Sequence, residues 1–145
     1  MANTMYESIT RQSLPTKEYR ELLGTALCVF SSNNGFFIEN ILRFDANDTL
    51  SWYELIDKSS GELPMIAKSI LANEQGQAIV KLFQKIVKMR NRIIHSFRIT
   101  NKEGEQSLAT KTKDGIQFEI TEAYLMEFIQ ENNTLSSMLH ELRGW

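Results

Sequence analysis

Seven basic residues and no acidic residue lie between Gln75 and Lys102. The whole chain carries a formal charge of −2, so the rest of the sequence carries −9 once these seven cations are set apart. A local concentration of positive charge favours a negatively charged partner. A solvated helix face that acids from other elements neutralise would give the same pattern, and both interpretations stay open. The seven residues are Lys81, Lys85, Lys88, Arg90, Arg92, Arg98 and Lys102.

Most of these cations form a ridge on one face of a predicted helix. Relative to Ile79, the ridge covers about 180° to 240° of a helical wheel. His95 falls beside the ridge, and Asn91 lies one turn before His95, so their side chains can meet. Arg98 would lie close by if the helix continued. The ridge residues are Lys81, Lys85, Lys88 and Arg92.

Arg90 falls inside the apolar stripe of the same helix, between Ile86 and Ile93. An unpaired charge in such a position is costly, so the guanidinium group needs acceptors. The alternative is that Arg90 reaches the end of the bundle and caps carbonyl groups there. The candidate partners on the inner side of the first long helix are Asn33, Asn34 and Asn40.

The stretch from Arg90 to His95 has the form R-N-x-x-x-H. It resembles the signature of HEPN domains, small helical bundles found in many prokaryotic ribonucleases of toxin–antitoxin and phage-defence systems. The context agrees with the resemblance, because the motif lies near the C-terminal end of a long basic helix that follows a long first helix. The likeness covers roughly residues 15–97 in the order of the helices.

The resemblance implies a metal-independent endoribonuclease without a cofactor, which cleaves RNA through attack by the ribose 2′-OH. His95 would move protons at that hydroxyl or at the leaving oxygen, since a histidine exchanges protons near neutral pH. Arg90 would stabilise charge on the phosphorane, and Asn91 would orient His95 or hold the phosphate. The implied RNA-binding residues are Lys81, Lys85, Lys88, Arg92 and Arg98.

The family pattern also implies a homodimer in which two such helices meet at a shared cleft. Arg90 and His95 are about 140° apart on one ideal helix, so a site that uses both is easier to build across a two-fold axis. An antitoxin or another regulatory protein is a further possible partner. Toxins of this family that pair with nucleotidyltransferase antitoxins often carry a tyrosine two residues after the histidine, and the antitoxin modifies it. The corresponding residue here is Phe97, which has no hydroxyl group to modify. The alternative function is a non-catalytic helical module that binds RNA or a partner and dimerises.

The periodicity predicts one domain over residues 1–145 of the all-α class, an antiparallel helical bundle with a small β-hairpin or three-stranded flap inserted before the last helix. The resemblance implies that this bundle is HEPN-like. Residues 1–14 form an N-terminal extension, and the insertion covers about 98–120. Gly35 should loosen or kink the first long helix, and 73–76 should be a loop. The expected helices cover about 15–45 and 77–97, short segments around Trp52 and after Pro64, and a last helix that Thr121 caps.

Several classes of protein are excluded by composition. The single Cys28 rules out an internal disulfide framework, and with two histidines it leaves too few ligands for an all-Cys/His structural zinc site. The chain has no run of about 18 apolar residues for a membrane helix. The polar N-terminus lacks the apolar core of a signal peptide, so a cytoplasmic protein is expected.

Overall fold

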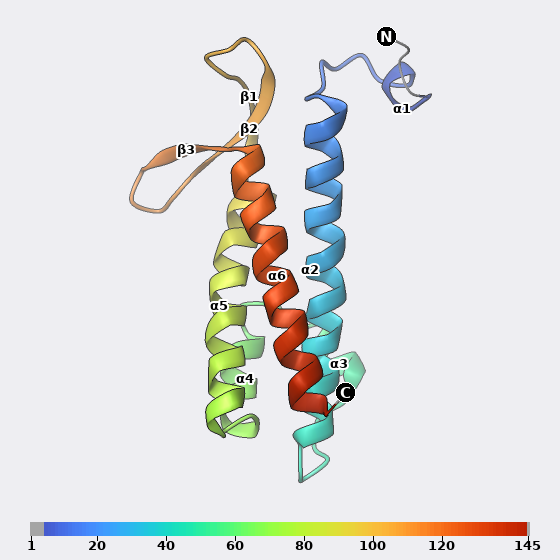
Figure 1. Ribbon diagram of the computed structural model, residues 1–145, viewed down its shortest axis with the longest axis vertical. Coiled ribbons are helices and arrows are strands. Elements are labelled where there is room, and N and C mark those ends of the chain that lie inside the picture. Colours follow the sequence, from blue (N-terminus) through green and yellow to red (C-terminus); the bar gives the residue numbers. More distant parts are fainter. Residues whose placement is uncertain (1–4, 145) are drawn as a thin grey trace.

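Three long helices form the frame of the molecule. The computed structural model describes residues 5–144. α5 runs antiparallel to α2 and α6, and α6 covers one face of the α2–α5 pair while α3 and α4 lie on the other (Figure 1). The helices are α1 (Met5–Ser8), α2 (Lys17–Phe44), α3 (Trp52–Ile56), α4 (Leu63–Ile70), α5 (Glu74–Ile94) and α6 (Glu122–Arg143).

Side-chain caps fix where the long helices begin. Thr16, Asn73 and Thr121 each accept a hydrogen bond from the backbone N–H three residues further on, at 3.2, 2.7 and 3.1 Å. Each cap satisfies a donor that has no partner inside the helix. α2 continues past Gly35, which confirms the prediction of one long helix.

The limits predicted for the third long helix were wrong at both ends. The helix begins at Glu74 rather than near residue 77, so residues 73–76 are its cap and first turn instead of a loop. It ends at Ile94 rather than Phe97. Glycine is required at position 76, in the first turn of α5, because a Cβ atom there would lie 2.4 Å from the carbonyl oxygen of Leu71 at the end of α4.

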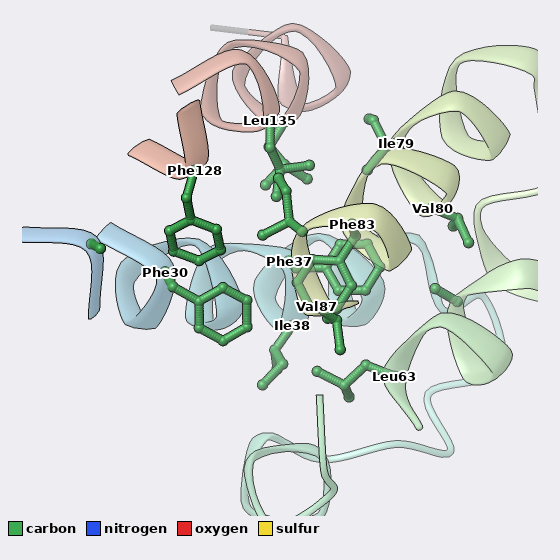
Figure 2. Packing of buried hydrophobic residues seen from close by; sticks show 14 of the residues in the cluster. Phe30, Phe37, Ile38, Leu63, Ile79, Val80, Phe83, Val87, Phe128 and Leu135 are labelled. Atoms are coloured by element: carbon green, nitrogen blue, oxygen red, sulfur yellow. The ribbon is translucent and has the colours of Figure 1, made fainter. Parts of the chain in front are cut away.

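Four phenylalanines join the long helices in the core. Phe37 of α2 stacks on Phe83 of α5 with ring centroids 4.1 Å apart. Phe30 packs between Phe83 and Phe128 of α6, at 6.1 and 6.2 Å (Figure 2). Such rings contribute large buried areas and a further gain from their offset stacking. The core therefore fixes the rotation of α5, and with it the directions in which the polar residues near its end point.

The predicted all-α class was wrong, because a three-stranded antiparallel sheet lies between α5 and α6. The strands are β1 (Phe97–Thr100), β2 (Gln106–Lys111) and β3 (Gln117–Ile120), in the order β1-β2-β3. The predicted insertion before the last helix is present, and it has the three strands of the predicted flap rather than the two of a hairpin.

The sheet contributes buried residues to the packed structure. It sits at the end of the bundle where α5 ends and α6 begins (Figure 1). Ala109, Thr110 and Ile120 are buried. Gly104 and Gly115 have φ values of 80° and 86°, and these two turns let the chain reverse twice. The fold is mostly helical with a small antiparallel sheet.

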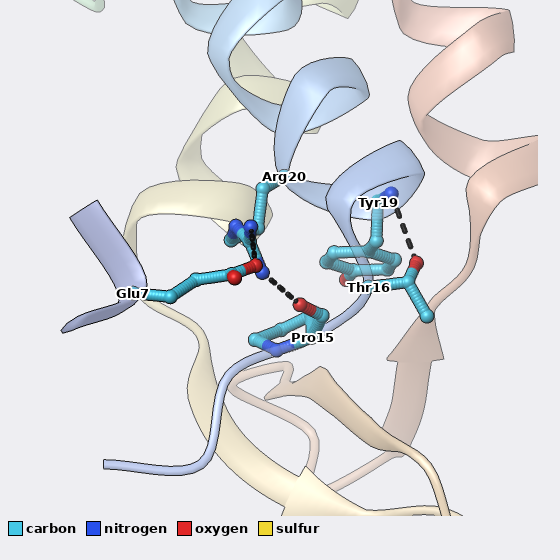
Figure 3. A network of polar contacts seen from close by, with 5 residues as sticks. All are labelled: Glu7, Pro15, Thr16, Tyr19 and Arg20. Carbon is cyan, nitrogen blue, oxygen red and sulfur yellow. Dashed lines mark hydrogen bonds and ion pairs between the residues drawn. The ribbon is translucent and has the colours of Figure 1, made fainter. Parts of the chain in front are cut away.

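The N-terminal extension folds back on the start of α2. Arg20 forms an ion pair with Glu7 of α1 and donates a hydrogen bond to the carbonyl oxygen of Pro15 at 2.6 Å (Figure 3). Arg98 of β1 donates to the carbonyl oxygen of Ser13. Residues 1–4 of the predicted extension lie outside the described residues.

Candidate functional site

His95 occupies the C-cap position of α5. Its backbone N–H donates to the carbonyl oxygen of Asn91 at 3.0 Å, and the chain then turns into β1. The imidazole is exposed and forms no hydrogen bond or ion pair with residues 5–144. No hydrogen bond joins it to the side chain of Asn91. Arg98 was expected beside the ridge only if the helix continued. The helix ends here, and Arg98 lies on β1. The ring nitrogens of His95 are therefore available to a ligand.

Arg90 packs over the ring of Phe30, with Cζ 5.1 Å from the ring centroid. Its Nη1 donates to Oδ1 of Asn91 at 3.2 Å. Burial lowers the pKa of the Arg90 guanidinium group, yet an arginine stays charged under ordinary conditions. No carboxylate of the described residues forms an ion pair with it. The group thus combines partial desolvation with several N–H donors that the chain leaves open.

The asparagines predicted as partners of Arg90 bond elsewhere. Asn33 donates to the carbonyl oxygen and to Oδ1 of Asn132 in α6, at 2.8 and 3.0 Å. Asn40 donates to a carbonyl oxygen of its own helix at 2.9 Å. Asn34 accepts from Oγ of Ser60 at 2.9 Å. The predicted pairing was therefore wrong, because the rotation of α2 directs Asn33 toward α6 instead of α5.

Arg90 lies in the wall of a pocket of about 350 Å³ between α2, the α3–α4 connection and α5. His95 is not among the residues that line it. The sequence analysis missed the contribution of the α3–α4 connection, since only the fold brings it beside the end of α5. The pocket is lined by Leu27, Phe30, Ser31, Asn34, Ile56, Lys58, Ser59, Ser60, Arg90 and Ile94.

The basic ridge divides into paired and unpaired cations. Lys85 forms an ion pair with Glu131 of α6 at 2.9 Å, and this contact raises the pKa of Lys85. Arg92 donates to the carbonyl oxygen of Lys111 at 2.6 Å. Within the described residues, Lys81 and Lys88 are exposed and form no ion pair.

The division bears on the two interpretations of the basic segment. Neutralisation by acids of another element holds for Lys85, and α6 supplies the acid. Arg92 and Arg98 each use one N–H on a backbone carbonyl, which leaves other guanidinium donors open. Lys81 and Lys88 are the ridge cations with the fewest contacts to the chain, so a polyanion would meet these two first.

The structure thus brings the side chains of Arg90 and Asn91 into contact, while the imidazole of His95 forms no hydrogen bond with either of them. Within residues 5–144, no three side chains of His, Cys, Asp or Glu gather in a way that could hold a metal ion. The same part of the chain contains no helix with the length and apolar character needed to span a bilayer. Comparison with protein-family models, curated proteins and solved structures finds no match to this chain.

Proposed function

We propose that the protein is a metal-independent endoribonuclease of HEPN type. The single observation that carries the proposal is Arg90, a partly desolvated cation with open N–H donors and no carboxylate partner in the described residues. It lies within the R-N-x-x-x-H stretch that ends at an exposed histidine. A guanidinium group with open donors suits two phosphate oxygens, and an exposed imidazole suits proton transfer.

The proposed reaction is attack of the ribose 2′-OH on the adjacent phosphodiester. The O2′–P bond forms and the P–O5′ bond breaks, which gives a 2′,3′-cyclic phosphate and a 5′-OH. One proton leaves the 2′-OH and one joins the leaving oxygen, so a base and an acid are needed. Arg90 stabilises the charge that grows on the phosphorane, and Asn91 helps to place the guanidinium group through its Oδ1.

A homodimer would supply both proton-transfer groups. One chain offers one exposed histidine at this end of α5, and a two-fold axis there would bring a second His95 to the same phosphate. An apolar side chain beside His95 supports an interface, since Phe97 is 44% exposed. The proposed dimer also removes the need for Arg90 and His95 of the same chain to converge.

A toxin or phage-defence role fits a cytoplasmic ribonuclease that acts on the RNA of the cell or of an invader, and an antitoxin or other regulatory protein would then control it. The second candidate function is RNA binding without cleavage by a helical dimerisation module. The unpaired Lys81 and Lys88 favour this candidate, because they offer a cationic surface that does not depend on His95.

The test is incubation of RNA with the protein in EDTA. We expect cleavage by the wild type and a loss of about 100- to 10,000-fold in His95→Ala, as for removal of a general acid or base. His140→Ala is the matched control and should cleave normally. DNA and 2′-O-methyl RNA should stay intact, since both lack the attacking hydroxyl. Cleavage of DNA at a similar rate, or full activity in His95→Ala, would refute the mechanism. A salt-dependent gel shift without cleavage would favour the binding module.

A further inference from the structure

We infer that the pocket between α2, the α3–α4 connection and α5 is a nucleotide subsite. It takes one unstacked nucleobase of single-stranded RNA against its apolar wall, with the adjoining phosphate on Arg90. The inference rests on the proposed function for its choice of RNA as the ligand. It goes further in that it assigns a base-binding role to residues outside the R-N-x-x-x-H stretch, and it defines the substrate as single-stranded.

The charges of the pocket suit a phosphate. Arg90 and Lys58 line it, and no Asp or Glu is among the lining residues. Within residues 5–144 neither cation forms an ion pair with a carboxylate. Glu62, in the same connection, accepts a hydrogen bond from the backbone N–H of Ser59 at 3.1 Å and does not line the pocket. Two cations without a counter-charge at one cavity favour an anionic ligand.

The apolar wall suits the flat face of a base. Leu27, Ile56 and Ile94 come from three different elements, and they are 40%, 42% and 45% exposed. Exposed apolar residues are ordinary when scattered, but a group of them around one cavity marks a binding site. Phe30 lines the same pocket, and the guanidinium group of Arg90 lies over its ring. Enzymes that take a base out of its stack hold it between apolar side chains of this kind.

Polar groups in the same wall can read the edge of the base. Asn34 accepts a hydrogen bond from Ser60 through Oδ1, which fixes its amide. Its Nδ2 donates to no acceptor within the described residues, and Ser31 also lines the pocket. A few placed polar groups in an apolar cavity are typical of small-molecule sites.

The size of the pocket decides between a nucleotide and a protein partner. Its volume of about 350 Å³ lies at the lower end of the range for small-molecule sites. A protein helix with its side chains is about 10 Å across and needs a long groove. A base inside a duplex is stacked and cannot enter such a pocket, so the substrate class is single-stranded RNA or an unpaired loop.

The experiment is an NMR titration that follows the methyl groups of the chain. The probes are inorganic phosphate and the four nucleoside 3′-monophosphates. We expect at least one nucleotide to bind tenfold more tightly than phosphate and to shift the signals of Leu27, Ile56 and Ile94. Ile56→Trp fills the pocket and should weaken nucleotide binding at least tenfold while phosphate binding stays. Met65→Trp, at an exposed position on α4 outside the pocket, is the matched control and should bind as the wild type does.

Three results would overturn the inference. The first is equal binding of phosphate and nucleotides, and the second is wild-type nucleotide binding by Ile56→Trp. The third is a shift of the pocket signals on dilution of the protein but not with nucleotide, which would show that a second copy of the chain occupies the pocket. A failure of this inference can be distinguished from a failure of the proposed function. Nucleotide binding by a chain that never cleaves RNA removes the ribonuclease and keeps the subsite, whereas cleavage without nucleotide binding in this pocket does the reverse.

Discussion

Asn33 on α2 and Arg90 on α5 are both polar residues within the apolar stripes of their helices, and their surroundings are opposite. Asn33 is buried and donates twice to Asn132, whose own amide donates to the carbonyl oxygen of Phe128 at 2.9 Å. Arg90 is half-buried, and within residues 5–144 its side chain has one hydrogen bond, to its neighbour Asn91.

The difference separates a polar group that the described residues satisfy from one whose donors they leave mostly open. A buried polar group that the chain satisfies contributes to stability and to the register of the helices. A partly desolvated cation with open donors costs free energy unless it is paired, and a bound phosphate would recover that cost. We therefore assign the Asn33–Asn132 pair to the fold and Arg90 to the site.

The largest effect on stability is expected at the Asn33–Asn132 pair. Asn33→Ala leaves Oδ1 of Asn132 buried without its donor, so the free energy of unfolding should fall by about 1–3 kcal/mol. The double variant Asn33→Leu/Asn132→Leu removes both polar groups and should recover much of the loss. Urea unfolding measures both effects. A loss below about 0.5 kcal/mol in Asn33→Ala is typical of a surface substitution. It would show that the Asn33–Asn132 pair contributes little to the stability of the fold.

Tyr124 is a second scaffold group, and it gives the fold an alkaline limit. Its hydroxyl donates to the carbonyl oxygen of Met89 at 3.1 Å, and burial raises the pKa of Tyr124 to about 12. The unfolded chain loses this proton near the ordinary value of 10.0. The stabilisation is therefore complete below pH 10 and is lost as the pH rises through 12.

Tyr124→Phe should lower the free energy of unfolding by about 1 kcal/mol at neutral pH. Its melting temperature should also decline less than that of the wild type above pH 10. Burial also raises the pKa of Tyr19, which is present in both proteins, so a remaining decline in the variant is expected. Thermal melts of the two proteins across the alkaline range check this, and superimposable pH profiles would show that Tyr124 titrates alike in the folded and unfolded states.

The ridge extends the comparison to the surface, where the expected effects are smaller. Lys81→Gln and Lys88→Gln should each reduce the slope of the logarithm of RNA affinity against the logarithm of salt by about one. Lys85→Gln should reduce the slope less, because Glu131 already neutralises Lys85. Binding of an uncleavable 2′-O-methyl RNA at several salt concentrations measures the slopes. A larger change for Lys85 than for Lys88 would show that RNA displaces Glu131.

Local patterns in the sequence predicted the parts of the fold that local physics controls. The apolar period of 3.6 residues places α2 as one helix through Gly35, and Thr121 caps α6 as expected. The end of α5 was missed because Ile94 and Phe97 continue the helical period, although Phe97 begins β1. The cap at Asn73 had an available signal, an asparagine followed by an acidic first turn.

The site was harder to predict because it depends on contacts between elements. The helical wheel placed Arg90 on the inner side of α5, and the structure agrees in packing it over Phe30. Its surroundings did not follow from the wheel. The packing of α6 on α2 places Asn132 where it accepts a hydrogen bond from Asn33. The path of the α3–α4 connection brings Lys58 into the same pocket as Arg90. Neither contact can be predicted from the sequence of one helix alone.

The free energy of unfolding of Arg90→Met tests the central claim most directly. Methionine keeps an apolar, polarisable contact with Phe30 and removes the charge. If Arg90 serves a ligand, the variant loses its cation–π contact and its hydrogen bond to Asn91, but it also loses a partly desolvated charge. These effects oppose one another, so the variant should unfold within about 1 kcal/mol of the wild type, or be more stable. A loss of about 3 kcal/mol or more is the cost of breaking a buried charged pair. That result would show that Arg90 belongs to the scaffold, as Asn33 does, and would contradict the assignment of the site.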